Sequence, residues 1–195
     1  MAAYPAIAAT SEAILGLLES ASPGTEFEGA RFDHYGAKEL NDPMSDGVSL
    51  WLYRVTVNTV RRSSPPRLAP DGTRYRPSLP LDLHYLLIAW GSPLKQQRLL
   101  GWCARTIEDT PILPVGLLNH YGPEADVFAA DEAVELVWES LSQQDLYDIW
   151  EVAKHNAQPA IPYSARMVMI DSTVPLDEYA PVQTRDLGYA TAAAE

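Results

Sequence analysis

Cysteine, basic residues and long apolar runs are all scarce in this chain of 195 residues. The single cysteine, Cys103, has no partner for an internal disulfide, so we expect a fold that does not depend on an oxidising compartment. No run approaches the roughly 18 apolar residues of a membrane-spanning helix, so no membrane insertion is expected. The N-terminal segment lacks the basic stretch of a signal peptide, and Glu12 interrupts its apolar part. We therefore expect a cytoplasmic protein.

The shortage of positive charge excludes further classes of protein. Fourteen Lys and Arg stand against 26 Asp and Glu, which gives a formal net charge of −12. Binding to nucleic acid or to anionic lipid selects for a basic surface, so we expect neither as a partner. The sequence also lacks the glycine-rich phosphate-binding motifs, the serine-nucleophile motif and the zinc-protease motif. We expect no cofactor and no enzymatic activity.

Two mirrored apolar segments predict the centre of a β-sheet. In 48-VSLWLYRVTVN-58 the residues are almost all apolar up to Tyr53, and alternation of polar and apolar residues follows from Arg54. The segment 80-PLDLHYLLIAW-90 shows the reverse order, with the alternation first and the continuous apolar run second. Antiparallel pairing would place the two half-exposed ends side by side, and likewise the two covered ends. We predict a hairpin closed by a long loop over about 60–79. Loops of this length within a compact domain are usually functional or disordered.

The rest of the chain predicts helices and further strands. Thr10 or Ser11 is expected to cap a first helix, and Ser92 is the expected N-cap of a second, with Pro93 at its first position. Ser142 and Asp145 resemble a capping box that opens a third helix. The expected elements are a helix before 22–24, a strand at 31–35, a helix at 92–109, a turn-rich connection at 110–125, a strand at 132–140, a helix at 143–155 and a strand at 163–171. We assign residues 1–174 to one domain and residues 175–195 to a loosely ordered tail.

Candidates for chemistry are few and scattered. The histidines at positions 34, 84, 120 and 155 have no spacing typical of a metal pair, so no metal is expected. His84 lies on the polar face of its strand, where a hydrogen-bonded role is favoured, and Cys103 lies on an apolar helix face as a small hydrophobe. A small enzyme that uses His84 with Asp82 or Cys103 is an alternative. Such an enzyme would be active as an isolated monomer and inactive after His84→Ala.

Opposite charges are segregated along the chain. The long loop contains five basic residues and a single acid, Asp71; the five are Arg61, Arg62, Arg67, Arg74 and Arg76. The segment 124–151 contains nine acids and no Lys or Arg. Two solvated surfaces would account for this pattern. The functional interpretation is head-to-tail self-association, in which the planar arginine side chains bind carboxylates of the next copy. The acids that we assign to this contact are Glu135, Glu139, Asp145 and Asp148.

Six segments of the chain follow one another in a recognisable order. They are VSLWLYRVTVN, the arginine- and proline-bearing loop, LPLDLHYLLIAWG, QQRLLGWCARTIEDTPILP, LSQQDLYDIW and PAIPYSARMVMID. This succession resembles the cap, or tube-terminator, proteins of phage-tail-like contractile injection systems, over roughly residues 14–172. The resemblance implies an α/β (α+β) fold like that of phage tail terminators, with a mixed, mainly antiparallel sheet flanked by helices.

The same resemblance implies a structural function. A cap of this family would form a sixfold ring at the baseplate-distal end of the inner tube, where it would end tube growth and anchor the last sheath layer. The expected partners are further copies of the chain in a hexamer, the inner tube protein and the contractile sheath protein. The family supplies no catalytic residues, and the contact residues given above rest on the charge pattern alone. An adaptor that links the particle to a cellular or envelope partner is the alternative.

Overall fold

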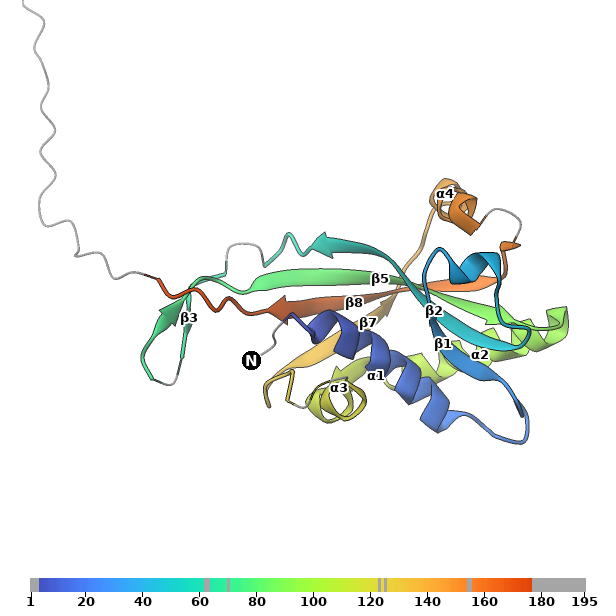
Figure 1. Cartoon of the computed structure of the whole chain (residues 1–195), viewed down its shortest axis with the longest axis horizontal. Coiled ribbons are helices and arrows are strands. Elements are labelled where there is room, and N and C mark those ends of the chain that lie inside the picture. The colour runs from blue at the N-terminus through green and yellow to red at the C-terminus, as the bar shows by residue number, and fades with distance from the viewer. Residues whose placement is uncertain are drawn as a thin grey trace, which may run out of the picture.

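A twisted β-sheet with helices on both faces forms the body of the molecule (Figure 1). The computed structural model describes residues 4–176, apart from residues 62, 63, 70, 123, 125, 154 and 155. Three helices cover one face, a fourth lies on the other face, and a small hairpin projects at one end of the long axis. The helices are α1 (Ala6–Ala21), α2 (Pro93–Asp109), α3 (Val115–Tyr121) and α4 (Gln143–Ala153).

Six strands form the main sheet, in the order β1-β2-β5-β8-β7-β6. Their bounds are Arg31–Tyr35 (β1), Gly47–Val57 (β2), Leu79–Trp90 (β5), Ile112–Pro114 (β6), Ala133–Trp138 (β7) and Ala160–Ile170 (β8). The β1–β2 pair is parallel, and the other neighbours in this sheet are antiparallel. The prediction of a mixed, mainly antiparallel sheet flanked by helices is confirmed.

The central hairpin of β2 and β5 has the arrangement that its mirrored pattern predicts. Gly47 faces Trp90 at the covered end of the pair, and Val57 faces Leu81 at the other end. The first part of β2 is buried, whereas from Arg54 onward its residues are exposed or half-buried. The reason is the cover on the sheet, since α4 lies over the covered end only (Figure 1). The predicted hairpin is confirmed.

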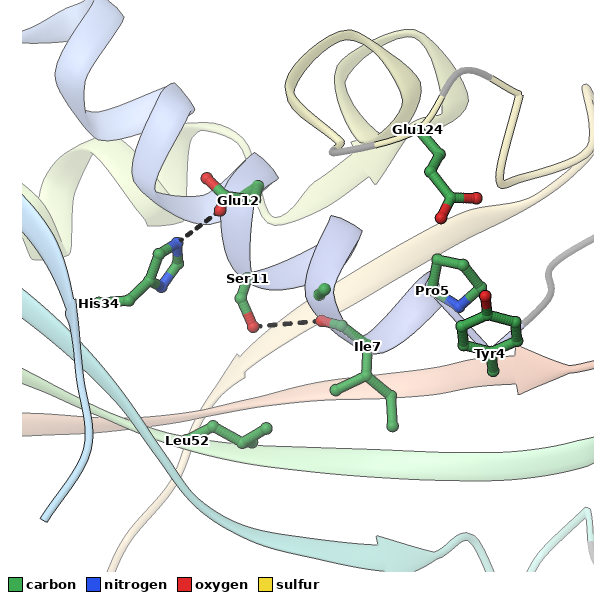
Figure 2. Close-up of a pocket in the computed structure, with 9 residues that line it drawn as sticks. Tyr4, Pro5, Ile7, Ser11, Glu12, His34, Leu52 and Glu124 are labelled. Carbon is green, nitrogen blue, oxygen red and sulfur yellow. Dashed lines mark hydrogen bonds and ion pairs between the residues drawn. The ribbon is translucent and has the colours of Figure 1, made fainter.

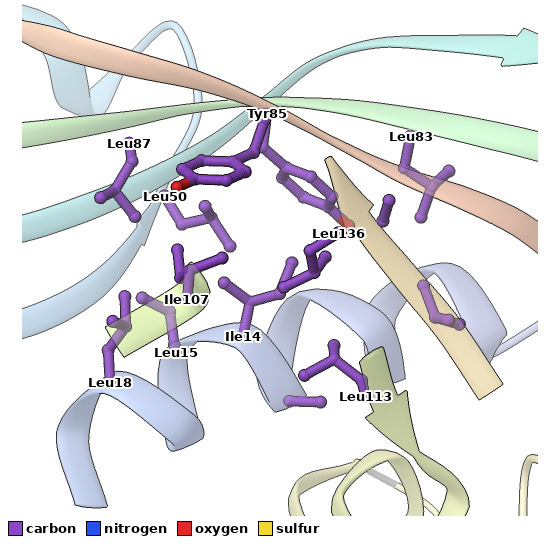
Figure 3. Packing of buried hydrophobic residues seen from close by; sticks show 14 of the residues in the cluster. Ile14, Leu15, Leu18, Leu50, Leu83, Tyr85, Leu87, Ile107, Leu113 and Leu136 are labelled. Atoms are coloured by element: carbon purple, nitrogen blue, oxygen red, sulfur yellow. The ribbon is translucent and has the colours of Figure 1, made fainter. Parts of the chain in front are cut away.

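The larger core fills the space between the sheet and the helices α1, α2 and α3 (Figure 3). Alternate residues of β5, among them Leu83, Tyr85 and Leu87, point to this side and pack against Ile14 of α1. Full burial of one such aliphatic side chain contributes roughly 2 kcal/mol to folding. The Tyr85 hydroxyl lies 2.8 Å from the hydroxyl of Ser11, so its polar end is satisfied within the core.

A smaller core lies on the opposite face of the sheet, beneath α4. The intervening residues of β5 point to this side, and the 3-10 helix η1 (Glu39–Asn41) closes it with Leu40. Its members are Tyr35, Leu40, Trp51, Leu86, Ile88 and Trp90, with Leu146, Ile149 and Trp150 of α4 packed against them. The buried Trp90 indole donates a hydrogen bond to the Ser49 hydroxyl at 2.8 Å. The two cores show why the apolar half of β5 is continuous, because helices cover both faces there.

The first helix begins earlier than predicted. α1 starts at Ala6, so Thr10 and Ser11 lie within the helix and do not cap it. Their hydroxyls donate to the carbonyls four residues back, those of Ala6 and Ile7, at 2.8 and 3.1 Å. Such bonds are the alternative use of Ser and Thr inside a helix, and the alanine-rich stretch before them has a high helix propensity. The predicted cap is therefore wrong.

Two more boundaries differ from the predictions. The connection at 110–125, predicted to be turn-rich, contains β6 and α3. β8 begins at Ala160, three residues before the predicted start at 163, and passes through Pro162. The carbonyl of Pro162 accepts the N–H of Glu139 at 3.0 Å, just past the end of β7. Because β7 has ended at this point, no strand carbonyl is left without a partner by the N–H that proline lacks. Proline is therefore tolerated at this position of β8.

The predicted starts of the other two helices agree with the structure. Ser92 is the N-cap residue of α2, although its side chain makes no capping hydrogen bond, and Pro93 follows in the first turn. The capping box before α4 is present. The N–H of Asp145 donates to the Ser142 hydroxyl at 3.1 Å, and the N–H of Ser142 donates to the Asp145 carboxylate at 3.3 Å.

Candidate functional site

The long loop between β2 and β5 folds into an arm with a small sheet of its own. Here β3 (Arg67–Leu68) pairs antiparallel with β4 (Arg74–Tyr75). Gly72 lies in the turn between them at φ 87°, a left-handed conformation that favours glycine. We call residues 58–78 the basic arm. The sequence predicted only a loop here, because strands of two residues show no readable alternation.

The last described residues of the chain hold the basic arm in place. The N–H of Arg76 donates to the Val174 carbonyl at 3.1 Å, and the N–H of Leu176 donates to the Arg74 carbonyl at 2.8 Å. The chain after β8 therefore runs along β4 as a third extended segment. The predicted loosely ordered tail, 175–195, begins with this paired segment, and its residues from 177 onward lie outside the described part.

Arg67 is bound within its own chain. Its Nε lies 3.4 Å from the Asp171 carboxylate, and both side chains are largely buried. The distance is that of an ion pair without hydrogen-bond geometry, since Nε has no hydrogen-bond partner among the described residues. The guanidinium carbon also lies 4.6 Å from the centroid of the Tyr75 ring, within the range of a cation–π contact. Arg67 thus fastens the basic arm to the end of β8.

Three other arginines of the predicted contact project into solvent. Arg61, Arg74 and Arg76 are exposed, and within the described part of the chain none of them forms an ion pair. Arg62 lies outside the described residues. Exposed guanidinium groups retain their charge and their donors for a partner.

The predicted acids lie on β7, directly after it and on α4, on the side of the sheet opposite to α1. Glu135 is exposed on β7, directly beside Arg166 of β8 in the strand register. Asp145 and Asp148 are exposed on α4. Asp145 is the partner of Ser142 in the capping box, and Asp148 accepts a hydrogen bond from the Gln144 side chain within the same helix. Both of these carboxylates therefore make only local contacts and stay accessible.

Glu139 differs from the other acids because it is tied into the protein. Its two carboxylate oxygens each lie 3.0 Å from Nδ1 of His84, and the Tyr53 hydroxyl donates to it at 3.5 Å. Nε2 of His84 lies 2.8 Å from the Thr56 hydroxyl, so both ring nitrogens have partners. Burial, followed by the nearby charge of Glu139, raises the pKa of Tyr53 to about 12. The sequence suggested hydrogen bonding for His84 but did not identify these partners.

The residues of the alternative enzymatic site are not brought together. The Asp82 carboxylate binds the side-chain amide of Asn58 at 3.0 Å and the N–H of Met167 at 3.1 Å, rather than His84. Cys103 is buried in the core on the other face of the sheet, and this burial raises the pKa of its thiol to about 12. A neutral, buried thiol is inert as a nucleophile at neutral pH. Within the described residues, no group of three or more His, Cys, Asp or Glu could hold a metal ion.

An apolar hollow lies between the start of α1 and the middle of β2 (Figure 2). Its volume is about 560 Å³, and Tyr4, Ile7 and Leu52 are among its lining residues. Along it, the Glu12 carboxylate lies 3.3 Å from Nε2 of His34, with both side chains partly exposed. No pattern in the sequence indicates this hollow, because it arises where the first turn of α1 meets a strand far away along the chain.

Comparison with known protein families gives a match over residues 9–184, to the Pvc16 N-terminal domain. This range is most of the chain. The chain belongs to the Pvc16 N-terminal domain family. The family was expected from the order of the strand and helix segments, and the resemblance to cap and tube-terminator proteins is confirmed. No curated protein sequence matches this Pvc16 N-terminal domain.

Two solved structures share the fold of this Pvc16 N-terminal domain. One is the sheath/tube terminator of the extracellular contractile injection system PVC in its extended state, with a TM-score of 0.63 at 12% identity. The other is the tube-terminating cap of the anti-feeding prophage, with a TM-score of 0.59 at 10% identity. The alignments cover 96% and 92% of this chain, but 64% and 60% of the solved chains. The chain therefore spans less than two thirds of the length of these structures.

Proposed function

We propose that this chain is a structural cap of a contractile injection system. It would bind the baseplate-distal end of the inner tube, end tube growth and anchor the last sheath layer. The partners in this proposal are further copies of the chain in a hexameric ring, the inner tube protein and the sheath protein, assembled in the cytoplasm. No catalytic step is part of this function.

The observation that carries the proposal is the agreement of family and fold. The family match spans residues 9–184, and the two solved relatives of the same fold are a sheath/tube terminator and a tube-terminating cap. A fold alone does not define a function, so the surfaces of this chain must also suit the role. A projecting basic arm and an exposed acidic helix support this role, because surfaces of opposite charge favour contacts between subunits. Among the described residues, none of the helices combines the length and the hydrophobicity of a membrane-spanning segment.

The decisive experiment removes this chain from a particle-producing system. Without it, we expect inner tubes of uncontrolled length and sheaths that lack a defined distal end in electron micrographs. Supplying the intact chain should restore uniform tubes, and a tagged copy should give density at one end only. Tubes of normal, uniform length in the absence of the chain would refute the terminator function.

A further inference from the structure

We propose that the basic arm of one copy docks on the outer face of α4 of a second copy. This inference deepens the ring proposed above and rests on it for its biological setting, although its test needs only the isolated chain. The contact joins two different surfaces, so it is head-to-tail. Repeated around an axis, such a contact closes into a ring when the rotation between copies allows it.

The end of the molecule that carries the basic arm has the composition of an interface. Several large aliphatic side chains are exposed there beside the free guanidinium groups of Arg74 and Arg76. These side chains, with their exposed fractions, are Val60 (89%), Leu68 (66%), Leu79 (45%) and Val174 (46%). Scattered exposed apolar residues are ordinary, but a group of them at one end marks a surface that another molecule covers. Arginine among apolar side chains is typical of protein–protein contacts.

The outer face of α4 complements this surface in charge. Its inner side is used by Leu146, Ile149 and Trp150 in the smaller core. The outward stripe, at spacings i, i+3, i+4 and i+7, consists of Gln144, Tyr147, Asp148 and Glu151. Asp148 and Glu151 are exposed and form no ion pair among the described residues, and Tyr147 of the same stripe is 62% exposed.

A shallow groove beside this stripe has room for a partner's side chain. It lies between α4 and β2, has a volume of about 290 Å³ and is lined by Tyr53, Arg54, Leu141, Asp145, Asp148 and Ile149. An arginine entering it would find the carboxylates of Asp145 and Asp148 for paired hydrogen bonds, whereas the Tyr53 ring already has the guanidinium of Arg54 at 5.8 Å from its centroid. Lysine would supply the charge without the planar geometry. The groove and the stripe therefore favour arginine over a generic cation.

The contact must form between copies because the two surfaces lie apart on one molecule. The hairpin of β3 and β4 projects from one end of the long axis, whereas α4 lies over the sheet toward the other end (Figure 1). The arm cannot fold back onto its own α4, because Arg67 is paired with Asp171 and β4 is bonded to the segment after β8. Because these contacts already order the basic arm, docking costs less conformational entropy than it would for a flexible loop.

The structure also reduces the set of residues that can form the contact suggested by the charge pattern. Arg67 and Glu139 are engaged within their own chain, by Asp171 and by His84 respectively. We therefore assign them to positioning: Arg67 holds the arm and Glu139 supports the sheet beneath the groove. The direct contacts fall to Arg74 and Arg76 on one copy, and to Asp148 and Glu151 on the next.

The test is a charge swap, read by mass photometry and sedimentation of the full chain at low and high salt. Two variants each reverse one surface: Arg74→Glu with Arg76→Glu on the arm, and Asp148→Arg with Glu151→Arg on α4. We expect the wild type to assemble at low salt, and each variant alone to assemble at least about tenfold more weakly. An equal mixture of the two variants should assemble again, and so should a single chain with all four substitutions.

A control reverses two exposed cations elsewhere, Lys38→Glu with Arg98→Glu. It should assemble like the wild type once circular dichroism shows that loss of the Arg98–Glu26 ion pair leaves the fold intact. The milder pair Arg74→Gln with Arg76→Gln serves if a reversal impairs folding, as judged by circular dichroism. A monomeric wild type at low salt, unimpaired single-surface variants, or a mixture that stays apart would each overturn the inference. The two proposals fail in different ways. If only the terminator function is wrong, the isolated chain still self-associates, but tubes made without the chain keep their normal length.

Discussion

Nδ1 of His84 lies 3.0 Å from both carboxylate oxygens of Glu139, although the two residues come from strands that are not neighbours. His84 belongs to β5 and Glu139 follows β7, and β8 runs between these strands in the sheet. The contact between His84 and Glu139 therefore crosses over β8, on the face of the sheet that α4 covers only in part. Through Nε2 the same imidazole reaches Thr56 of β2. One side chain thus links three parts of the sheet.

Removal of the Glu139 carboxylate should lower the stability of the fold. Glu139→Ala leaves Nδ1 of His84 and the Tyr53 hydroxyl without their partner, at an expected cost of about 1–3 kcal/mol in the free energy of unfolding. Urea denaturation followed by tryptophan fluorescence measures this. Glu135→Ala, at an exposed position of β7, is the control and should change the stability by less than about 0.5 kcal/mol. Equal effects at both positions would show that the His84–Glu139 contact does not stabilise the sheet.

Two glycines in helices should respond oppositely to alanine. A Cβ at Gly16 of α1 would lie 2.3 Å from the Tyr121 ring, whereas a Cβ at Gly101 of α2 would meet no atom within 4 Å. Gly101→Ala should stabilise the chain by about 1 kcal/mol through helix propensity. Gly16→Ala should destabilise it by about 1–3 kcal/mol, because α3 must shift.

The Gly16 result can be checked by a double-mutant cycle with Tyr121→Ala. Once the ring is removed, Gly16→Ala should become neutral or stabilising, so the coupling between the two positions should be large. Thermal unfolding of the four variants would measure it. A destabilising Gly16→Ala in the Tyr121→Ala background would mean that the close approach of α1 and α3 does not depend on this ring.

Loss of the Arg67 side chain should loosen the basic arm while the sheet stays folded. Arg67→Ala removes both the ion pair with Asp171 and the stacking on Tyr75. We expect amide exchange at Ala69 and Gly72, whose N–H groups form the turn of the arm, to become at least about tenfold faster. Hydrogen exchange read by mass spectrometry reports this directly. Arg61→Ala is the control, and an equal response there would show that Arg67 does not fasten the arm.

The buried thiol of Cys103 should make the stability depend on pH in the alkaline range. Its pKa is raised to about 12 by burial, from about 8.5 in an unfolded chain. The stability contributed by keeping this thiol protonated is therefore fully present below about 8.5 and is lost as the pH rises toward 12. The free energy of unfolding should fall more steeply in the wild type than in Cys103→Ala, by up to about 1.4 kcal/mol per pH unit. Parallel pH profiles for the two proteins would contradict this.

Local features of the sequence were enough to predict most of the larger helices and strands of this protein. The mirrored patterns of 48–58 and 80–90 predicted the central hairpin, because period-two alternation reports directly which strand faces are covered. Pro93 after Ser92, and the capping box at Ser142, located the starts of α2 and α4 from neighbouring residues alone. The order of these segments also predicted the family and the class of sheet.

Relationships between distant residues were decided by the tertiary structure. The sequence could not show that Arg67 belongs to Asp171, or Glu139 to His84, because these partners are far apart along the chain and meet only when β8 and β7 join the sheet. It placed five arginines in one loop, and the fold decided which of them stay free for a partner. Charge can be counted along a sequence. Its availability depends on burial and on which opposite charge lies nearby, and both are properties of the packed structure.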